Sequence, residues 1–152
     1  MSALIVDGGH PLEGAVDIQG AKNSVLPILA ACVLAPGECA IRNCPNLSDV
    51  TASVKILRQL GCGVRQEGDA LVVDARRIGS CAVPDHLMRE MRSSVIFLGA
   101  ILGRMGAAEL SFPGGCELGP RPINLHLAAL RALGAQVEEK GGRLTCRAPR
   151  LT

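Results

Sequence analysis

The segment Leu57-Arg-Gln-Leu-Gly-Cys-Gly-Val64 returns 73 residues later as Leu130-Arg-Ala-Leu-Gly-Ala-Gln-Val137. Further upstream, Gly37-Glu-Cys-Ala-Ile41 is echoed by Gly106-Ala-Ala-Glu-Leu110 at an offset of only 69 residues. The second copy therefore carries about four extra residues, which fall between Leu110 and Leu130. Self-similarity at this period indicates a duplicated supersecondary unit. The insertion marks the place where the second copy does something that the first does not.

Each copy predicts the same five elements: a helix, a strand, a second helix and a hairpin of two strands. The first helix is apolar on nearly every side, which is typical of a buried helix. Gly61 is suited to end the second helix of the first copy, which Ser48 or Asp49 can cap at its start. We expect the elements of the first copy at 23–34, 38–42, 48–60, 64–66 and 70–74, and those of the second copy at 93–104, 109–112, 123–133, 137–139 and 143–147.

Two helices that are apolar on all sides must be covered by other elements on all sides. We therefore predict a mixed α/β (α+β) fold, in which helix-strand-helix-strand-strand units pack their sheets around buried central helices. Strands at 3–7 and 15–19 precede the first unit, and a short helix at 84–91 separates the two. Two units leave such an enclosure open, so we expect the chain to be part of a longer protein.

Composition narrows the class of protein. The chain has 152 residues and a net charge of +2, which suits about one domain and gives no reason to expect a nucleic-acid or membrane partner. Two Phe residues and no Tyr or Trp argue against a base-stacking platform. The seven Cys residues include no CxxC pair, so we expect no metal site and no metal cofactor. Scattered cysteines without a signal sequence indicate reduced thiols and a cytoplasmic protein.

The first candidate for chemistry is Gly20-Ala-Lys22-Asn23, at the start of the first buried helix. Backbone N–H groups are unpaired there, and the helix dipole favours anions. Lys22 is electrostatically misplaced at a helix start unless an anion pairs with it. The alternative is an ordinary solvated lysine after a turn.

Two further candidates lie in the second copy. Met91-Arg92-Ser93-Ser94 places a cation at the equivalent helix start, so the two starts could face one anion; the alternative is a surface arginine. The inserted loop, 113–122, holds Cys116 between glycines and Arg121 near its end. A nearby cation can lower the pKa of such a thiol, which favours a reactive cysteine over a free thiol in a turn.

Together these stretches resemble the UDP-N-acetylglucosamine 1-carboxyvinyltransferases, which are enolpyruvyl transferases. The resemblance covers essentially the whole chain, and the cysteine loop is its most specific part. The sister family, the 3-phosphoshikimate 1-carboxyvinyltransferases, shares the repeats but lacks this loop. The matching motifs, in chain order, are Gly8-Gly9-x-Pro11-Leu12-x-Gly14, Gly20-Ala-Lys-Asn23, Met91-Arg-Ser-Ser94 and Pro113-Gly-Gly-Cys-x-x-Gly-x-Arg-Pro122.

The resemblance implies an inside-out barrel of two domains, each with three repeat units around central helices. Residues 1–20 would belong to the second domain of a protein well over twice as long. Residues 21–152 would form two of the three units of one domain, with the first unit at about 21–75 and the second at about 84–148. The missing C-terminal part would hold the general base.

The resemblance also implies the reaction and the roles of its residues. The family joins the enolpyruvyl group of phosphoenolpyruvate to the 3-hydroxyl of UDP-N-acetylglucosamine and releases phosphate, which begins peptidoglycan synthesis and so serves cell-wall biogenesis, cell shape and cell division. Cys116 would be the loop acid and the target of fosfomycin. The residues expected to bind substrate are Lys22, Asn23, Arg92, Arg121, Pro122, Asn124 and Leu125. The family usually has Asp where this chain has Asn124, which removes a charge from the nucleotide contact.

Two alternatives remain open beside this interpretation. One is a catalytically dead, repeat-built binding module, and the other is an enzyme like the 3-phosphoshikimate 1-carboxyvinyltransferases. We also expect this chain to be an inactive fragment by itself, because no candidate base lies near Cys116.

Overall fold

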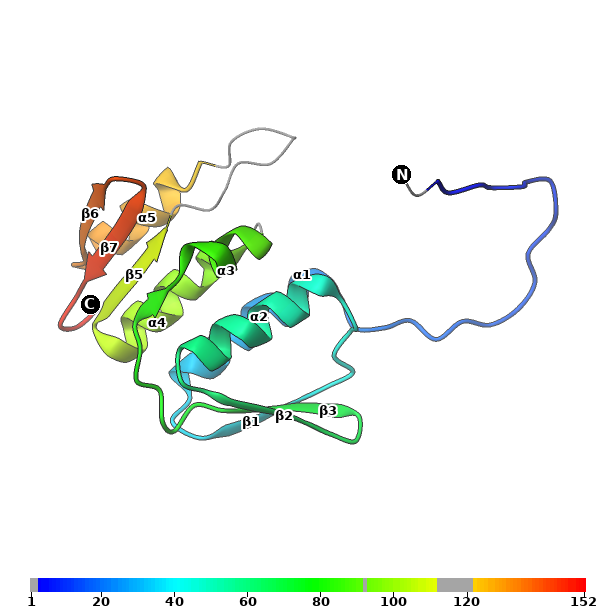
Figure 1. Ribbon diagram of the computed structural model, residues 1–152, viewed down its shortest axis with the longest axis horizontal. Coiled ribbons are helices and arrows are strands. Elements are labelled where there is room, and N and C mark those ends of the chain that lie inside the picture. The colour runs from blue at the N-terminus through cyan, green and yellow to red at the C-terminus, as the bar shows by residue number, and fades with distance from the viewer. Residues whose placement is uncertain (1–2, 92, 112–121) are drawn as a thin grey trace.

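The computed structural model describes residues 3–91, 93–111 and 122–152, which form two sheets with helices between and beside them (Figure 1). The first unit contains α1 (Lys22–Ala31), a 3-10 turn η1 (Cys32–Leu34), β1 (Glu38–Arg42), α2 (Ser48–Gln59), β2 (Gly63–Glu67) and β3 (Ala70–Asp74). β4 (Ala82–Val83) and α3 (Asp85–Glu90) follow it. The second unit contains η2 (Ser94–Ile96), α4 (Phe97–Met105), β5 (Ala107–Ser111), α5 (Asn124–Ala132), β6 (Gln136–Lys140) and β7 (Arg143–Arg147).

The two sheets repeat the same topology. The first has the strand order β1-β3-β2, and the second has β4-β5-β7-β6, in which β5, β7 and β6 correspond to β1, β3 and β2. All pairs are antiparallel except β4 with β5, which run parallel. The mixed α/β fold of repeated units that the sequence predicts is therefore confirmed.

Hydrogen bonds recur with the sequence repeat. The amide of Cys62 donates to the carbonyl of Leu57 at 2.9 Å, and the amide of Ala135 donates to that of Leu130 at 3.0 Å. Gly61 has a φ of +100°, which suits a glycine at the end of a helix. The same backbone hydrogen bond thus forms after α2 and after α5. In both units it reverses the chain, so that the next strand, β2 or β6, runs back along the helix.

One core joins the two units. α1 and α2 pack against each other, and α1 also packs against α4. Among the described residues, the largest fully buried side chain is that of Phe97 at the start of α4, which is 0% exposed. Leu29 of α1 and Leu57 of α2 are equally inaccessible, so aliphatic side chains supply the rest of the core. This packing holds the beginnings of α1 and α2 in a fixed relation.

Two expectations from the sequence need correction, and one strand was missed. α1 is not buried on all sides: Ile28 is 48% exposed, because the described part of the chain covers only one side of the helix. No side-chain hydrogen bond caps α2 from Ser48 or Asp49, since the cap position belongs to Leu47. β4 was not predicted, because a strand of two residues gives no periodic signal.

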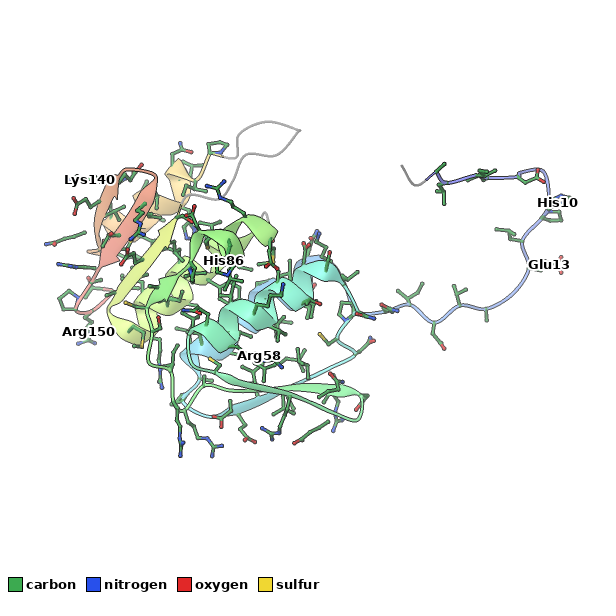
Figure 2. All side chains as sticks on the ribbon, in the orientation of Figure 1. His10, Glu13, Arg58, His86, Lys140 and Arg150 are labelled. Atoms are coloured by element: carbon green, nitrogen blue, oxygen red, sulfur yellow. The ribbon has the colours of Figure 1, made fainter. Side chains whose placement is uncertain are left out.

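The N-terminal segment also differs from the prediction. Strands were expected at 3–7 and 15–19, but the structure has no strand at residues 3–20. Leu4 is 92% exposed and Ile18 is 82% exposed, so these apolar side chains have no surface to pack on. Figure 2 shows His10 and Glu13 on this extended segment, away from the helices and sheets. A strand needs a partner, and the described residues provide none here.

Candidate functional site

The beginnings of α1 and α2 are held together by a close approach of two backbone segments. A Cβ atom added at Gly20 would collide with the backbone carbonyl oxygen of Asn43. Asn43 itself has a φ of +50°, a left-handed conformation that asparagine tolerates better than most residues. The chain entering α1 therefore lies directly against the loop that leads into α2, and only glycine fits at position 20.

This approach places Lys22 beside Asp49. Lys22 is the first residue of α1, Asp49 is the second residue of α2, and Nζ of Lys22 lies 2.5 Å from Oδ2 of Asp49. The Lys22 side chain is 51% exposed, whereas that of Asp49 is only 19% exposed. The lysine at this helix start thus has an anionic partner within the chain, while its side chain remains half exposed.

The first turn of α1 keeps an open face toward solvent. Lys22 and Asn23 are both exposed, and no side chain in the described part of the chain caps the helix. The first amides of an α-helix have no partner within the helix and carry the positive end of its dipole. An ammonium group beside such amides is a suitable place for an anionic ligand.

The predicted nucleotide contacts lie at the beginning of α5. Pro122, Asn124 and Leu125 are all exposed, and Leu125 is 80% exposed although it is apolar. Figure 1 draws the beginning of α5 well apart from the beginning of α1. The described residues therefore do not bring the predicted nucleotide contacts together with Lys22.

Three predicted site residues, Arg92, Cys116 and Arg121, lie outside the described residues. Asp49, by contrast, is a residue of the site that the sequence analysis named only as a helix cap. The available signal was an acidic residue in the first turn of one helix and a lysine without an evident anion at the start of another.

The cysteines that the structure describes are free and mostly shielded. Burial raises the pKa of Cys32 to about 12, and the neighbouring thiol of Cys39 adds to the effect. Burial also raises the pKa values of Cys44, Cys62 and Cys146. The thiolate is the reactive form, so these groups are poor nucleophiles near neutral pH.

We expect Cys116 to be alkylated before Cys32 and Cys62 when the folded chain meets limiting iodoacetamide at pH 8. Each unit by which a pKa exceeds the pH lowers the thiolate fraction about tenfold, and burial adds a steric barrier. Peptide mass spectrometry of the labelled chain measures the order. Earlier labelling of Cys32 or Cys62 would contradict this, and labelling in denaturant, where all seven thiols should react similarly, is the control.

Two general features of the described residues bear on the class of protein. No group of three His, Cys, Asp or Glu side chains among residues 3–91, 93–111 and 122–152 is arranged to hold a metal ion. Within the same ranges, none of the helices has the length and apolar character needed to cross a membrane.

Comparison with known proteins gives consistent matches over nearly the whole chain. The family model described as EPSP synthase (3-phosphoshikimate 1-carboxyvinyltransferase) matches residues 6–149. A protein of Caldanaerobacter subterraneus named UDP-N-acetylglucosamine 1-carboxyvinyltransferase 2 is 47% identical over 99% of this chain and 36% of its own length. A protein of Shewanella amazonensis named UDP-N-acetylglucosamine 1-carboxyvinyltransferase is 46% identical over 97% of this chain and 35% of its own length. The chain thus spans about a third of the length of these relatives.

Solved structures give the same fold. The enolpyruvyl transferase NikO from Streptomyces tendae superposes with a TM-score of 0.81 at 28% identity, over 95% of this chain and 32% of NikO. The EPSP synthase of Acinetobacter baumannii superposes with a TM-score of 0.62 at 16% identity, over 90% of this chain and 32% of that protein. The second likeness bears on the fold alone.

Proposed function

Because the chain belongs to the EPSP synthase (3-phosphoshikimate 1-carboxyvinyltransferase) family, we propose that it forms part of an enzyme that transfers the enolpyruvyl group of phosphoenolpyruvate to UDP-N-acetylglucosamine. The observation that carries this proposal is the 46–47% identity to relatives named for that acceptor, across almost the entire chain. The cysteine loop at 113–122 favours the same acceptor over 3-phosphoshikimate.

The proposed reaction exchanges one carbon–oxygen bond for another. The 3-hydroxyl of the sugar gives its proton to the general base expected in the rest of the enzyme, and its oxygen bonds to C2 of phosphoenolpyruvate while C3 takes up a proton from the acid. This gives a tetrahedral intermediate that still carries phosphate. The bond from C2 to the phosphate oxygen then breaks, and C3 gives up a proton to restore the double bond. Such a reaction needs cations around the phosphate and carboxylate, and an acid beside C3.

In this proposal the chain supplies cations and an acid. Lys22 at the exposed start of α1 contacts the phosphate of phosphoenolpyruvate. The unpaired backbone amides of the first helical turn favour the same anion. Arg92 and Arg121 complete the set of cations, and Cys116 is the acid and the residue that fosfomycin would modify. Asn23 lies beside Lys22 at the start of α1.

The exposed beginning of α5 suits the uridine end of the nucleotide. Pro122, Asn124 and Leu125 present a proline, an amide and an apolar side chain to solvent there. The part of the enzyme that lies outside this chain would pack against this surface and cover Leu125. The same part would supply the general base.

We extend the proposal to the organisation of the complete enzyme. Residues 1–20 belong to its second domain, and residues 21–152 form two of three units, at about 21–75 and 84–148. The extended, unpacked residues 3–20 and the exposed side of α1 support this division. The enzyme acts in the cytoplasm at the start of peptidoglycan synthesis.

The test is turnover by the full-length protein that contains this chain, with phosphoenolpyruvate and each of two acceptors. We expect phosphate release with UDP-N-acetylglucosamine and none above background with 3-phosphoshikimate. Release only with 3-phosphoshikimate would assign the sister activity. Release with neither acceptor from a folded protein would favour a binding module and contradict the proposal.

A further inference from the structure

The ion pair between Lys22 and Asp49 joins two helix beginnings that both carry positive partial charge. A carboxylate in the first turn of a helix is stabilised by the dipole, whereas a lysine in that position is destabilised. The carboxylate of Asp49 therefore interacts favourably with the dipole of its own helix, α2. It also offsets the unfavourable position of the Lys22 charge at the start of α1. The 2.5 Å separation between Nζ and Oδ2 indicates a direct, charge-assisted contact.

The two partners differ in how they meet solvent. Asp49 is 19% exposed and Lys22 is 51% exposed, so the carboxylate belongs to the more shielded side chain of the pair and the ammonium group to the more exposed one. An ammonium group has three N–H donors, and one contact with Asp49 leaves the others for a ligand. The ammonium group of lysine is carried on a flexible four-carbon stem, and without a partner such as Asp49 the side chain would sample many rotamers.

We propose that Asp49 is a positioning residue, which holds the ammonium group of Lys22 in the orientation that receives the phosphate of phosphoenolpyruvate. This inference rests on the proposed function of Lys22. In this proposal Asp49 does not touch the substrate; it restrains Lys22 through the ion pair, and the close approach of Gly20 to Asn43 sets the spacing between the two helix beginnings.

A second role for Asp49 predicts the opposite result. If Asp49 merely neutralised Lys22, then the change Asp49→Asn would add net positive charge and would tighten binding of an anionic substrate. If Asp49 positions Lys22, the same change weakens use of phosphoenolpyruvate, because the ammonium group loses its preferred orientation. A misplaced reacting or binding group can cost about a hundredfold in rate.

The experiment compares Asp49→Asn with Asp49→Glu and Glu139→Gln in the full-length protein. Glu139→Gln is the matched control, because it removes an ion pair of 3.1 Å with Arg131 in the second unit. We expect Asp49→Asn to lower kcat/KM for phosphoenolpyruvate about tenfold to a hundredfold, with KM for the nucleotide within about twofold. Asp49→Glu should recover most of the loss. A lower KM for phosphoenolpyruvate in Asp49→Asn, or a loss no larger than that of Glu139→Gln, would overturn the proposal.

A spectroscopic measurement separates this proposal from the proposed function. The chain contains only three lysines, Lys22, Lys55 and Lys140, so ε-13C-labelled lysine gives three signals in the chain itself. We expect Lys22 to show restricted motion like Lys55, which pairs with Glu90 at 2.7 Å, and to become as mobile as Lys140 in Asp49→Asn. If the unmodified enzyme does not turn over, the proposed function fails. Unchanged Lys22 relaxation in Asp49→Asn refutes the positioning role independently.

Discussion

Changing Lys22 to alanine is expected to lower the turnover of the full-length enzyme by about a hundredfold to a thousandfold, which is the usual loss when one preorganised donor to a developing anion is removed. The reason is local. Lys22 is the charged group at the open start of α1, and no other described side chain of the first turn carries a positive charge. The loss should appear in kcat/KM for phosphoenolpyruvate, measured by initial rates of phosphate release, with KM for the nucleotide nearly unchanged.

Lys55 offers a matched control for this change. Its side chain is 49% exposed and also pairs with a carboxylate of another helix, Glu90 of α3, at 2.7 Å. Lys55→Ala therefore removes the same kind of side chain and the same kind of ion pair, but away from the start of α1. We expect activity within about twofold of the unmodified enzyme, as is typical of exposed pairs. An equal loss of kcat/KM in Lys22→Ala and Lys55→Ala would show that Lys22 does not act in the site.

Changing Phe97 to alanine is expected to lower the free energy of unfolding by about 3–5 kcal/mol, the usual cost of truncating a buried aromatic side chain. Phe97 is 0% exposed and lies at the start of α4, which packs against α1 and η1. The loss is large beside a typical total stability of about 5–15 kcal/mol. Urea unfolding followed by far-ultraviolet circular dichroism suits this chain, because it has no Trp or Tyr for fluorescence.

Leu133 is the control for Phe97. It is 43% exposed at the end of α5, so Leu133→Ala should cost about 1 kcal/mol or less. Phe97→Leu should fall between the two, because it keeps part of the buried volume. A loss below about 1 kcal/mol for Phe97→Ala would mean that the helices do not share the single core described for this chain.

The repeat made much of the fold predictable. Glycines such as Gly61 mark the ends of helices by their backbone conformation, and the same turn recurs 73 residues later, so the second helices and both hairpins follow from the sequence. The strand at 38–42 was predicted with the bounds that the structure gives. β4 escaped prediction because its two residues pair with β5, a neighbour that the sequence does not reveal.

The site was less predictable than the fold. A lysine at a helix start indicates an anion, but the sequence does not tell whether that anion is a ligand or another side chain. Asp49 resembles an N-cap in the sequence, and only the packing of α1 on α2 shows that it contacts Lys22 instead. The extended residues 3–20 illustrate the same limit, because alternating apolar residues form a strand only where another strand is available.

The most direct test of the central claim is the mass of the nucleotide after incubation with phosphoenolpyruvate and the full-length protein. The account predicts that UDP-N-acetylglucosamine gains one enolpyruvyl group, at a turnover within the usual range of about 1–1,000 per second. It also predicts no product with the 152-residue chain alone, because the general base is expected in the rest of the enzyme. A nucleotide of unchanged mass after incubation with a folded full-length protein would contradict the account.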